Sequence, residues 1–169
     1  MMKRLWMVLA VLALLCPALA LADGPVLLVE LPEGAEMIED VQFDDGDFIQ
    51  TYQLDGGATV QLLRYAAFGM TLDELAEGEW TGYTALRALP LAQVGAWPAQ
   101  GLRLDWTQEG EAVDVTLLLV EAGDQTLILQ AVYPQAMGQD AIDAAVQAML
   151  DSLDVLDQEM PVGDEVEVG

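Results

Sequence analysis

Apolar and polar residues follow the short period of β-strands over most of the chain. Runs rich in β-branched and aromatic residues alternate with turns that contain Gly, Asp or Pro, a pattern typical of antiparallel strands and hairpins. Residues 117–120 are all apolar, so their strand is expected inside the sheet with both faces covered. The expected strands are 26–31, 48–54, 58–66, 84–89, 102–107, 112–121 and 126–133.

Two segments follow the period of an α-helix instead. Thr71 with Glu74 three residues later is a capping box, which begins a short helix, and Gly78 is expected to end it. A second helix is expected over 139–155, where apolar residues recur at spacings of three and four. Its opposite side is an acidic stripe of Asp140, Asp143, Gln147, Asp151 and Asp154. The order of elements predicts an α+β domain in which an antiparallel β-sheet is packed by helices.

The first 22 residues have the parts of an export signal. Lys3 and Arg4 precede the apolar run 5–15, and small residues stand before the expected cleavage site after Ala22. We therefore expect a secreted or extracytoplasmic protein. The run is shorter than the roughly 20 residues of a membrane span, so no stable membrane insertion is expected after cleavage. An uncleaved anchor and a lipid on Cys16 are the alternatives.

Removal of this segment makes the domain more acidic. The chain has 29 Asp and Glu, five Lys and Arg, no His and a formal charge of −24. Without Lys3 and Arg4 the charge becomes −26, and no Cys is left for a disulfide. Residues 23–156 are expected to form one domain that its hydrophobic core stabilises. Residues 157–169 are expected to form a flexible acidic tail.

This composition excludes several classes of function. Nucleic-acid phosphates repel so negative a protein, and we expect no nucleic-acid partner. Without His, catalysis by Ser–His–Asp or Cys–His and zinc binding by His are excluded. Ser152 lies in the second helix without a base to activate it. We therefore expect neither an enzyme nor a cofactor. A small carboxylate-based enzyme is the remaining catalytic alternative.

Acidic residues concentrate between positions 36 and 47. Their carboxylates are the ligands that hard cations such as Ca²⁺ take, but their spacing does not match an EF-hand loop. The alternatives are a weak Ca²⁺ or other divalent-cation site and a solvated acidic loop. The acidic stripe of the second helix is a further candidate for a cation or a partner. The candidate metal ligands are Glu36, Glu39, Asp40, Asp44, Asp45 and Asp47.

Aromatic and basic residues are the candidates for ligand binding. Exposed rings bind sugars or peptides, whereas buried rings fill a core. An Arg in so acidic a chain pairs with an Asp or holds an anionic ligand, and Asp105, on the same strand face, is one obvious neighbour of Arg103. The candidate ligand-binding residues are Trp80, Tyr83, Trp97, Arg64, Arg87 and Arg103.

The order of these segments resembles that of a known family. The segments are TLDELAEGEW, GLRLDW, VDVTLLLVEA, QTLILQAVYP and IDAAVQAMLDSL. Over about residues 26–155 the chain resembles the PsbP-like family of extracytoplasmic domains, many of which are bacterial secreted proteins of unknown function. The resemblance implies an α/β/α sandwich and no shared catalytic residues. We therefore expect a secreted, non-enzymatic domain, a monomer or weak oligomer, that binds an unidentified protein or ligand outside the cytoplasm.

Overall fold

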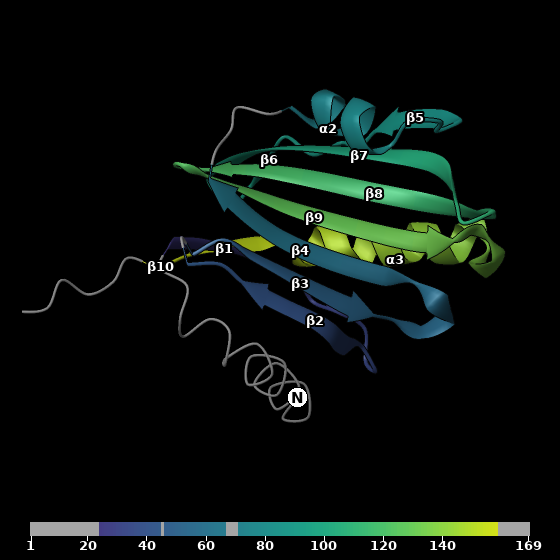
Figure 1. The fold of residues 1–169 in the computed structure, drawn as a ribbon, viewed down its shortest axis with the longest axis horizontal. Helices are drawn as coiled ribbons and strands as arrows, with labels where there is room; N and C mark the ends of the chain where they lie inside the picture. The colour runs from purple at the N-terminus through teal and green to yellow at the C-terminus, as the bar shows by residue number, and fades with distance from the viewer. Residues whose placement is uncertain (1–23, 45, 67–70, 159–169) are drawn as a thin grey trace, which may run out of the picture.

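The computed structural model describes residues 24–44, 46–66 and 71–158 (Figure 1). The expected export signal and its cleavage site lie outside these residues, as do positions 159–169 of the expected tail. Most of the described chain forms antiparallel β-sheet, and two α-helices pack against it. The expected α+β class is confirmed.

The main sheet has eight strands in the described part of the chain. Seven follow the order β2-β3-β4-β9-β8-β7-β5, β6 pairs with β7, and every pairing is antiparallel. A separate two-stranded sheet pairs β1 (Gly24–Leu28) with β10 (Asp154–Gln158). The strands of the main sheet are β2 (Glu36–Gln42), β3 (Phe48–Gln53), β4 (Thr59–Ala66), β5 (Ala85–Ala88), β6 (Gln93–Val94), β7 (Trp97–Gln108), β8 (Glu111–Ala122) and β9 (Gln125–Pro134).

Tight turns join the long strands into hairpins. The short 3₁₀ segment η1 (Asp55–Gly57) connects β3 to β4, as the sequence predicts, and a second one, η2 (Gln135–Met137), follows β9. Between β7 and β8, Glu109 and Gly110 both have positive φ, at 53° and 92°. This is the conformation of a two-residue hairpin turn whose twist matches that of the strands.

Helix α2 (Leu72–Glu79) begins at the predicted capping box. The Thr71 hydroxyl accepts from the Glu74 backbone N–H at 3.2 Å, and the Glu74 carboxylate accepts from the Thr71 N–H at 2.8 Å. The prediction that Gly78 ends this helix is wrong. The backbone stays helical through Gly78, and the last turn closes with a bond from the Trp80 N–H to the Ala76 carbonyl.

Helix α3 (Gln139–Ser152) ends three residues before the expected position. The chain becomes extended at Leu153 and enters β10, where Asp154 lies opposite Leu28 of β1. Asp154 therefore does not belong to the acidic stripe of the helix. Strand β10 continues through Gln158, so the first two residues of the expected tail belong to it.

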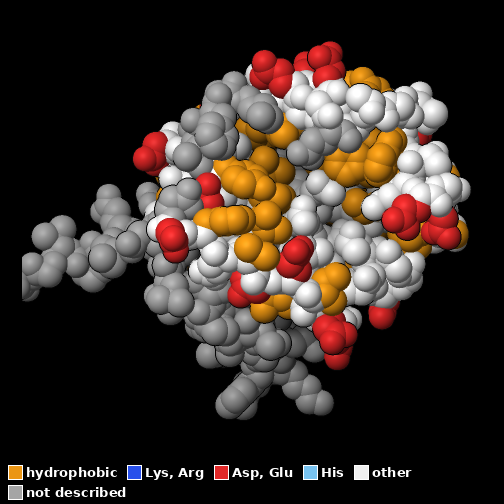
Figure 2. All heavy atoms as spheres, in the orientation of Figure 1, with side chains coloured by type: hydrophobic (Ala, Val, Ile, Leu, Met, Phe, Trp, Pro, Cys, Tyr) orange, Lys and Arg blue, Asp and Glu red, His pale blue; other side chains and the backbone are white. Residues whose placement is uncertain are grey.

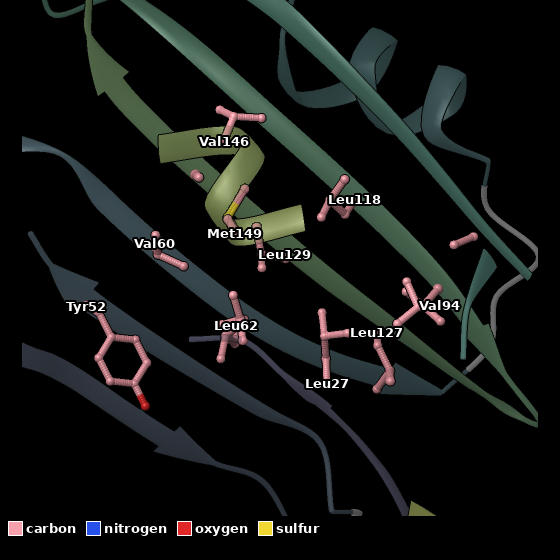
Figure 3. Close-up of a cluster of buried hydrophobic side chains, with 14 of the residues drawn as sticks. Leu27, Tyr52, Val60, Leu62, Val94, Leu118, Leu127, Leu129, Val146 and Met149 are labelled. Carbon is pink, nitrogen blue, oxygen red and sulfur yellow. The ribbon is translucent and has the colours of Figure 1, made fainter. Parts of the chain in front are cut away.

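The two helices pack against opposite faces of the sheet. On β8, Leu118 and Val120 belong to the apolar cluster that contains Ile142, Val146 and Met149 of α3 (Figure 3). Their neighbours on β8 belong to the cluster of α2, because successive residues of a strand point to opposite faces. The members from α2 and β8 are Leu72, Ala76, Val113, Val115, Leu117 and Leu119. Strand β8 is thus an interior strand covered on both faces, as predicted.

Two stretches of the sheet differ from the expectation. Residues 36–42, interpreted from sequence as part of an acidic loop region, form β2 at the edge of the sheet. Strand β7 begins at Trp97 rather than at 102, and it includes Pro98. Pairing extends it, because Ala99 lies opposite Val120 and Pro98 lies opposite Gln93 of β6.

Gly101 on β7 leaves no space for a side chain. An added Cβ would lie 2.9 Å from Cδ2 of Leu118 and 3.0 Å from Cβ of Leu89. We expect Gly101→Ala to lower the free energy of unfolding by about 1–3 kcal/mol through overpacking, measured by denaturant unfolding. Gly78→Ala is the control, because its Cβ would meet nothing within 4 Å and Ala favours a helix by about 0.5–1 kcal/mol. Equal stabilities of Gly101→Ala and the wild type would contradict this account.

Candidate functional site

Strand β2 forms an exposed edge of the main sheet. All seven of its residues are exposed, and β3 is its partner within the described part of the chain. An edge strand directs half of its backbone N–H and C=O groups away from the sheet, where another strand can pair with them. The edge therefore presents both hydrogen-bonding groups and side chains to the surroundings.

Large apolar side chains concentrate at this edge. Of the six large apolar side chains that are well exposed in the described residues, two lie elsewhere, Leu86 on β5 and Leu156 on β10. The other four are 37% to 57% exposed, and Ile38 is the most exposed of them. They are Met37, Ile38, Val41 and Phe43. Together with Glu36, Glu39 and Asp40, these four residues are called the β2 edge surface below.

A β-bulge shapes the β2 edge surface. The register steps from Met37 opposite Tyr52 to Glu39 opposite Thr51, so Ile38 is the extra residue on β2. Beyond the bulge, Val41 lies opposite Ile49 and continues a row of apolar residues across the sheet. The row consists of Val41, Ile49, Leu63 and Ile128, each directly opposite the next on the face away from α3. Figure 2 shows apolar side chains gathered over the middle of this face, with acidic side chains mostly around them.

The acids of β2 are partly bonded to β3. The Glu39 carboxylate accepts from the Thr51 hydroxyl at 2.7 Å, and the Asp40 carboxylate accepts from the Gln50 amide at 3.4 Å. Of the candidate metal ligands, Glu36, Glu39 and Asp40 are therefore spread along β2, and Asp44 and Asp47 lie in the turn that follows it. Within the described residues no three acidic side chains gather to hold a metal ion, and Asp45 lies outside those residues.

Arg64 is buried and joins three segments. Its guanidinium donates to the carbonyl oxygens of Gly46 and Pro25, and its Cζ lies 5.3 Å from the centroid of the Phe48 ring. Gly46 has a φ of 87° and belongs to the turn in which the Phe43 N–H donates to the Asp47 carbonyl at 2.9 Å. Arg64 thus fixes β1 and the turn after β2 to the body of the sheet.

Arg103 and Asp114 form a buried ion pair on the α3 side of the sheet. Asp114 is fully buried, and Arg103 donates to its carboxylate through Nε at 3.0 Å and Nη2 at 2.5 Å. The remaining Nη1 donates to Asp143 of α3 at 2.7 Å. This bidentate geometry satisfies both charges, which a buried pair requires. Tyr133, opposite Asp114 on β9, has its pKa raised by burial and by that carboxylate.

Arg87 completes the cluster. Its Nη2 donates to Asp105 at 2.9 Å and to Asp114 at 3.1 Å. The prediction that Asp105 is the neighbour of Arg103 is wrong. Cross-strand register explains the difference, because Arg87 lies directly opposite Arg103 and Asp105 directly opposite Asp114. Like charges that face one another repel, so each Arg pairs with an Asp on another strand. The cluster joins β5, β7, β8 and α3.

The candidate aromatic residues are divided between the two faces of the sheet. Trp80 is buried and packs edge-on against Trp106, with ring centroids 4.8 Å apart and an interplanar angle of 83°. Tyr83 packs against the same cluster, on the α2 side. Trp97 packs against the other cluster, on the α3 side. The three candidates therefore do not share one surface.

Sequence reasoning did not identify the β2 edge surface or the buried partners of the arginines. Asp114 had a detectable signal, since a carboxylate between Val113 and Val115 in an apolar strand requires a partner. The apolar residues of positions 37–43 stand among acids, which obscured their strand. Among the described residues, neither α-helix is long and apolar enough to span a membrane.

Comparisons with known proteins give no family for this chain. No protein-family model matches it. No curated protein sequence matches it. Among solved structures, a protein of unknown function, PA94 from Pseudomonas aeruginosa, is similar with a TM-score of 0.48 and 19% identity, over 73% of this chain and 94% of that one. LpqN, involved in cell envelope biogenesis of Mycobacterium tuberculosis, is similar with a TM-score of 0.45 and 12% identity, over 78% of this chain and 83% of that one.

Removal of Arg103 should destabilise the fold strongly. Arg103→Met removes the bidentate partner of the buried Asp114 and leaves it only the more exposed Arg87, which costs up to about 3–5 kcal/mol of unfolding free energy. The double variant Arg103→Met/Asp114→Leu should recover most of that loss, because it removes both charges. Arg87→Met is the matched control and should cost at most about 1 kcal/mol, since Arg87 is much more exposed. Denaturant unfolding measures all three, and a mild effect of Arg103→Met would contradict the assignment.

Asp143 should make the stability of the fold depend on pH in the acidic range. Hydrogen bonds from Arg103 and Gln139 lower the pKa of this carboxyl, so its stabilising effect is complete above the unfolded pKa of about 3.9. The effect disappears as the pH falls through the lower pKa of the folded state. The melting temperatures of Asp143→Asn and the wild type should therefore differ at pH 6 and converge below pH 4. Asp151→Asn, on the same helix, is the control and should follow the wild type more closely. A difference independent of pH would refute this role.

Proposed function

We propose that this protein is a secreted, non-enzymatic domain that binds a partner outside the cytoplasm through the β2 edge surface. The observation that carries the proposal is the concentration of exposed apolar side chains on one edge strand. Single exposed apolar residues are ordinary, whereas a contiguous group with polar residues around it is typical of an interaction site. The secreted location rests on the export signal in the first 22 residues.

Two acidic side chains of the described chain have a part in folding. Glu74 and Asp143 both have a lowered pKa. The capping hydrogen bonds of Thr71 cause the first shift, and the bonds from Arg103 and Gln139 cause the second. Both shifts belong to groups with a role in folding.

The same proposal includes the finer architecture. We assign the domain to the α/β/α sandwiches, the architecture that its resemblance to the PsbP-like family implies, because α2 and α3 pack against opposite faces of one antiparallel sheet. Such a fold leaves sheet edges as the sites where extended chains can be added. The architecture supports a binding domain.

A photo-cross-linking amino acid tests the binding surface in the secreting cell. Placed at position 41, it should give a discrete adduct with a partner protein, and Ile38→Ser in the same chain should reduce the yield about tenfold, because the apolar contact is lost. Placed at position 86, the exposed apolar position of β5, it should give no such adduct. Equal adducts at the two positions, no adduct at 41, or turnover of a common hydrolase substrate by the purified protein would each refute the proposal.

A further inference from the structure

We propose that the β2 edge surface binds an extended, basic segment of a partner protein, which adds to the main sheet as a further strand beside β2. This inference rests on the proposed function and specifies the partner and the manner of binding. Backbone hydrogen bonds along the edge would provide affinity, and charge and apolar contacts would select the segment.

The two edges of the main sheet differ in their capacity to accept a strand. Strand β2 has seven residues, all exposed, whereas β5 has four. On β5, Arg87 is held by Asp105 and Asp114. Natural edge strands are commonly short or charged, which prevents pairing with other chains. Strand β2 also has charges, but it is longer than β5. It exposes Met37, Ile38 and Val41 as well, and these apolar side chains do not serve to prevent pairing with another chain.

Charge determines the kind of strand that fits. Glu36, Glu39 and Asp40 lie on β2, and no Lys or Arg occurs between positions 23 and 63. The next cation along the chain, Arg64, is buried. An incoming strand with Lys or Arg opposite these acids gains attraction, and like charges directly opposite each other are unfavourable.

The acidic residues of β2 disfavour two other chain segments as the added strand. A second copy of the chain would place the acids of one β2 against those of another. The chain's own C-terminal segment, residues 159–169, contains four acidic residues and no Lys or Arg, so the edge would repel it too. A partner with basic residues is therefore the occupant that the electrostatics of the edge favour.

The two faces of β2 require apolar residues in the partner as well. On the α3 side, Met37 and Asp40 lie opposite Tyr52 and Gln50. On the other side, Glu36, Glu39 and Val41 lie opposite Gln53, Thr51 and Ile49. Each face of β2 thus presents one apolar residue and at least one acid. A complementary strand carries both Lys or Arg and β-branched residues.

Synthetic peptides test this inference with the mature protein. The probe is a blocked, fluorescently labelled octapeptide with the repeat Lys-Lys-Val-Val, which places both residue types on each face of a strand. Its binding is followed by anisotropy. Two altered forms separate the contributions: one has Glu in place of Lys, and one has N-methyl groups on the amides of one edge. We expect the Lys peptide to bind, the N-methylated form to bind at least about tenfold more weakly through loss of backbone hydrogen bonds, and the Glu form not to bind.

Variants of the chain locate the binding. Ile38→Ser/Val41→Ser should weaken binding of the Lys peptide about tenfold, while Leu86→Ser on β5 should leave it unchanged. Glu36→Gln/Asp40→Asn should weaken binding and reduce its dependence on salt. Amide hydrogen exchange of residues 36–42 should slow when the peptide is bound, because their outward N–H groups become hydrogen-bonded.

The possible failures are distinguishable from failure of the proposed function. Equal affinity for the N-methylated peptide would overturn strand addition, and equal affinity for the Glu peptide would overturn the basic partner. Absence of binding at about 1 mM peptide would overturn the inference as a whole. Self-association of the wild type that Ile38→Ser abolishes, seen by sedimentation, would overturn it in favour of a second copy. None of these results would remove an adduct formed at position 41, which tests the surface itself.

Discussion

Burial of β8 on both faces is the constraint that organises this domain. Residues 113–120 are buried without interruption, so apolar groups must cover both sides of the strand. Helix α3 and the β1–β10 pair provide cover on one side, and α2 provides it on the other. A helix is about 10 Å wide and strands are about 4.8 Å apart, so a single helix covers only about two strands. Among the described helices, the short α2 therefore does not reach the β2–β3–β4 end of its face.

The buried charges follow from the same constraint. Asp114 lies within the strand that the fold buries most completely, and it requires a cation close by. Two of the three Arg residues in the described chain, Arg87 and Arg103, are placed against it. The third, Arg64, holds a turn through backbone carbonyls. In a chain with so few cations, their use within the fold leaves the described surface dominated by acids.

The sequence correctly predicted the elements whose structure depends on residues that are close together in the chain. The capping box at Thr71, the β3–β4 hairpin and the interior position of β8 all depend on residues close in sequence, and the structure confirms them. Strand β2 was not predicted, since its residues lack clear alternation and its pairing with β3 creates it. The partners of Arg103 were predicted wrongly because register across β7 and β8 places Asp114 nearer than Asp105. The roles proposed for the aromatic residues depended on which face of the sheet each occupies, which only the tertiary structure shows.

The difference between the two edges of the main sheet, β2 and β5, has a consequence for the number of chains that can assemble. A protein with two equally open edges propagates into fibres, because each added chain offers a new edge for the next. Here β5 is four residues long and its Arg87 is engaged with two carboxylates, so the far side of the sheet is a poor acceptor. A strand gained at β2, as we propose, would occupy the longer edge of this domain and leave only the short β5 as a second acceptor. That mode of binding favours one-to-one complexes over fibres.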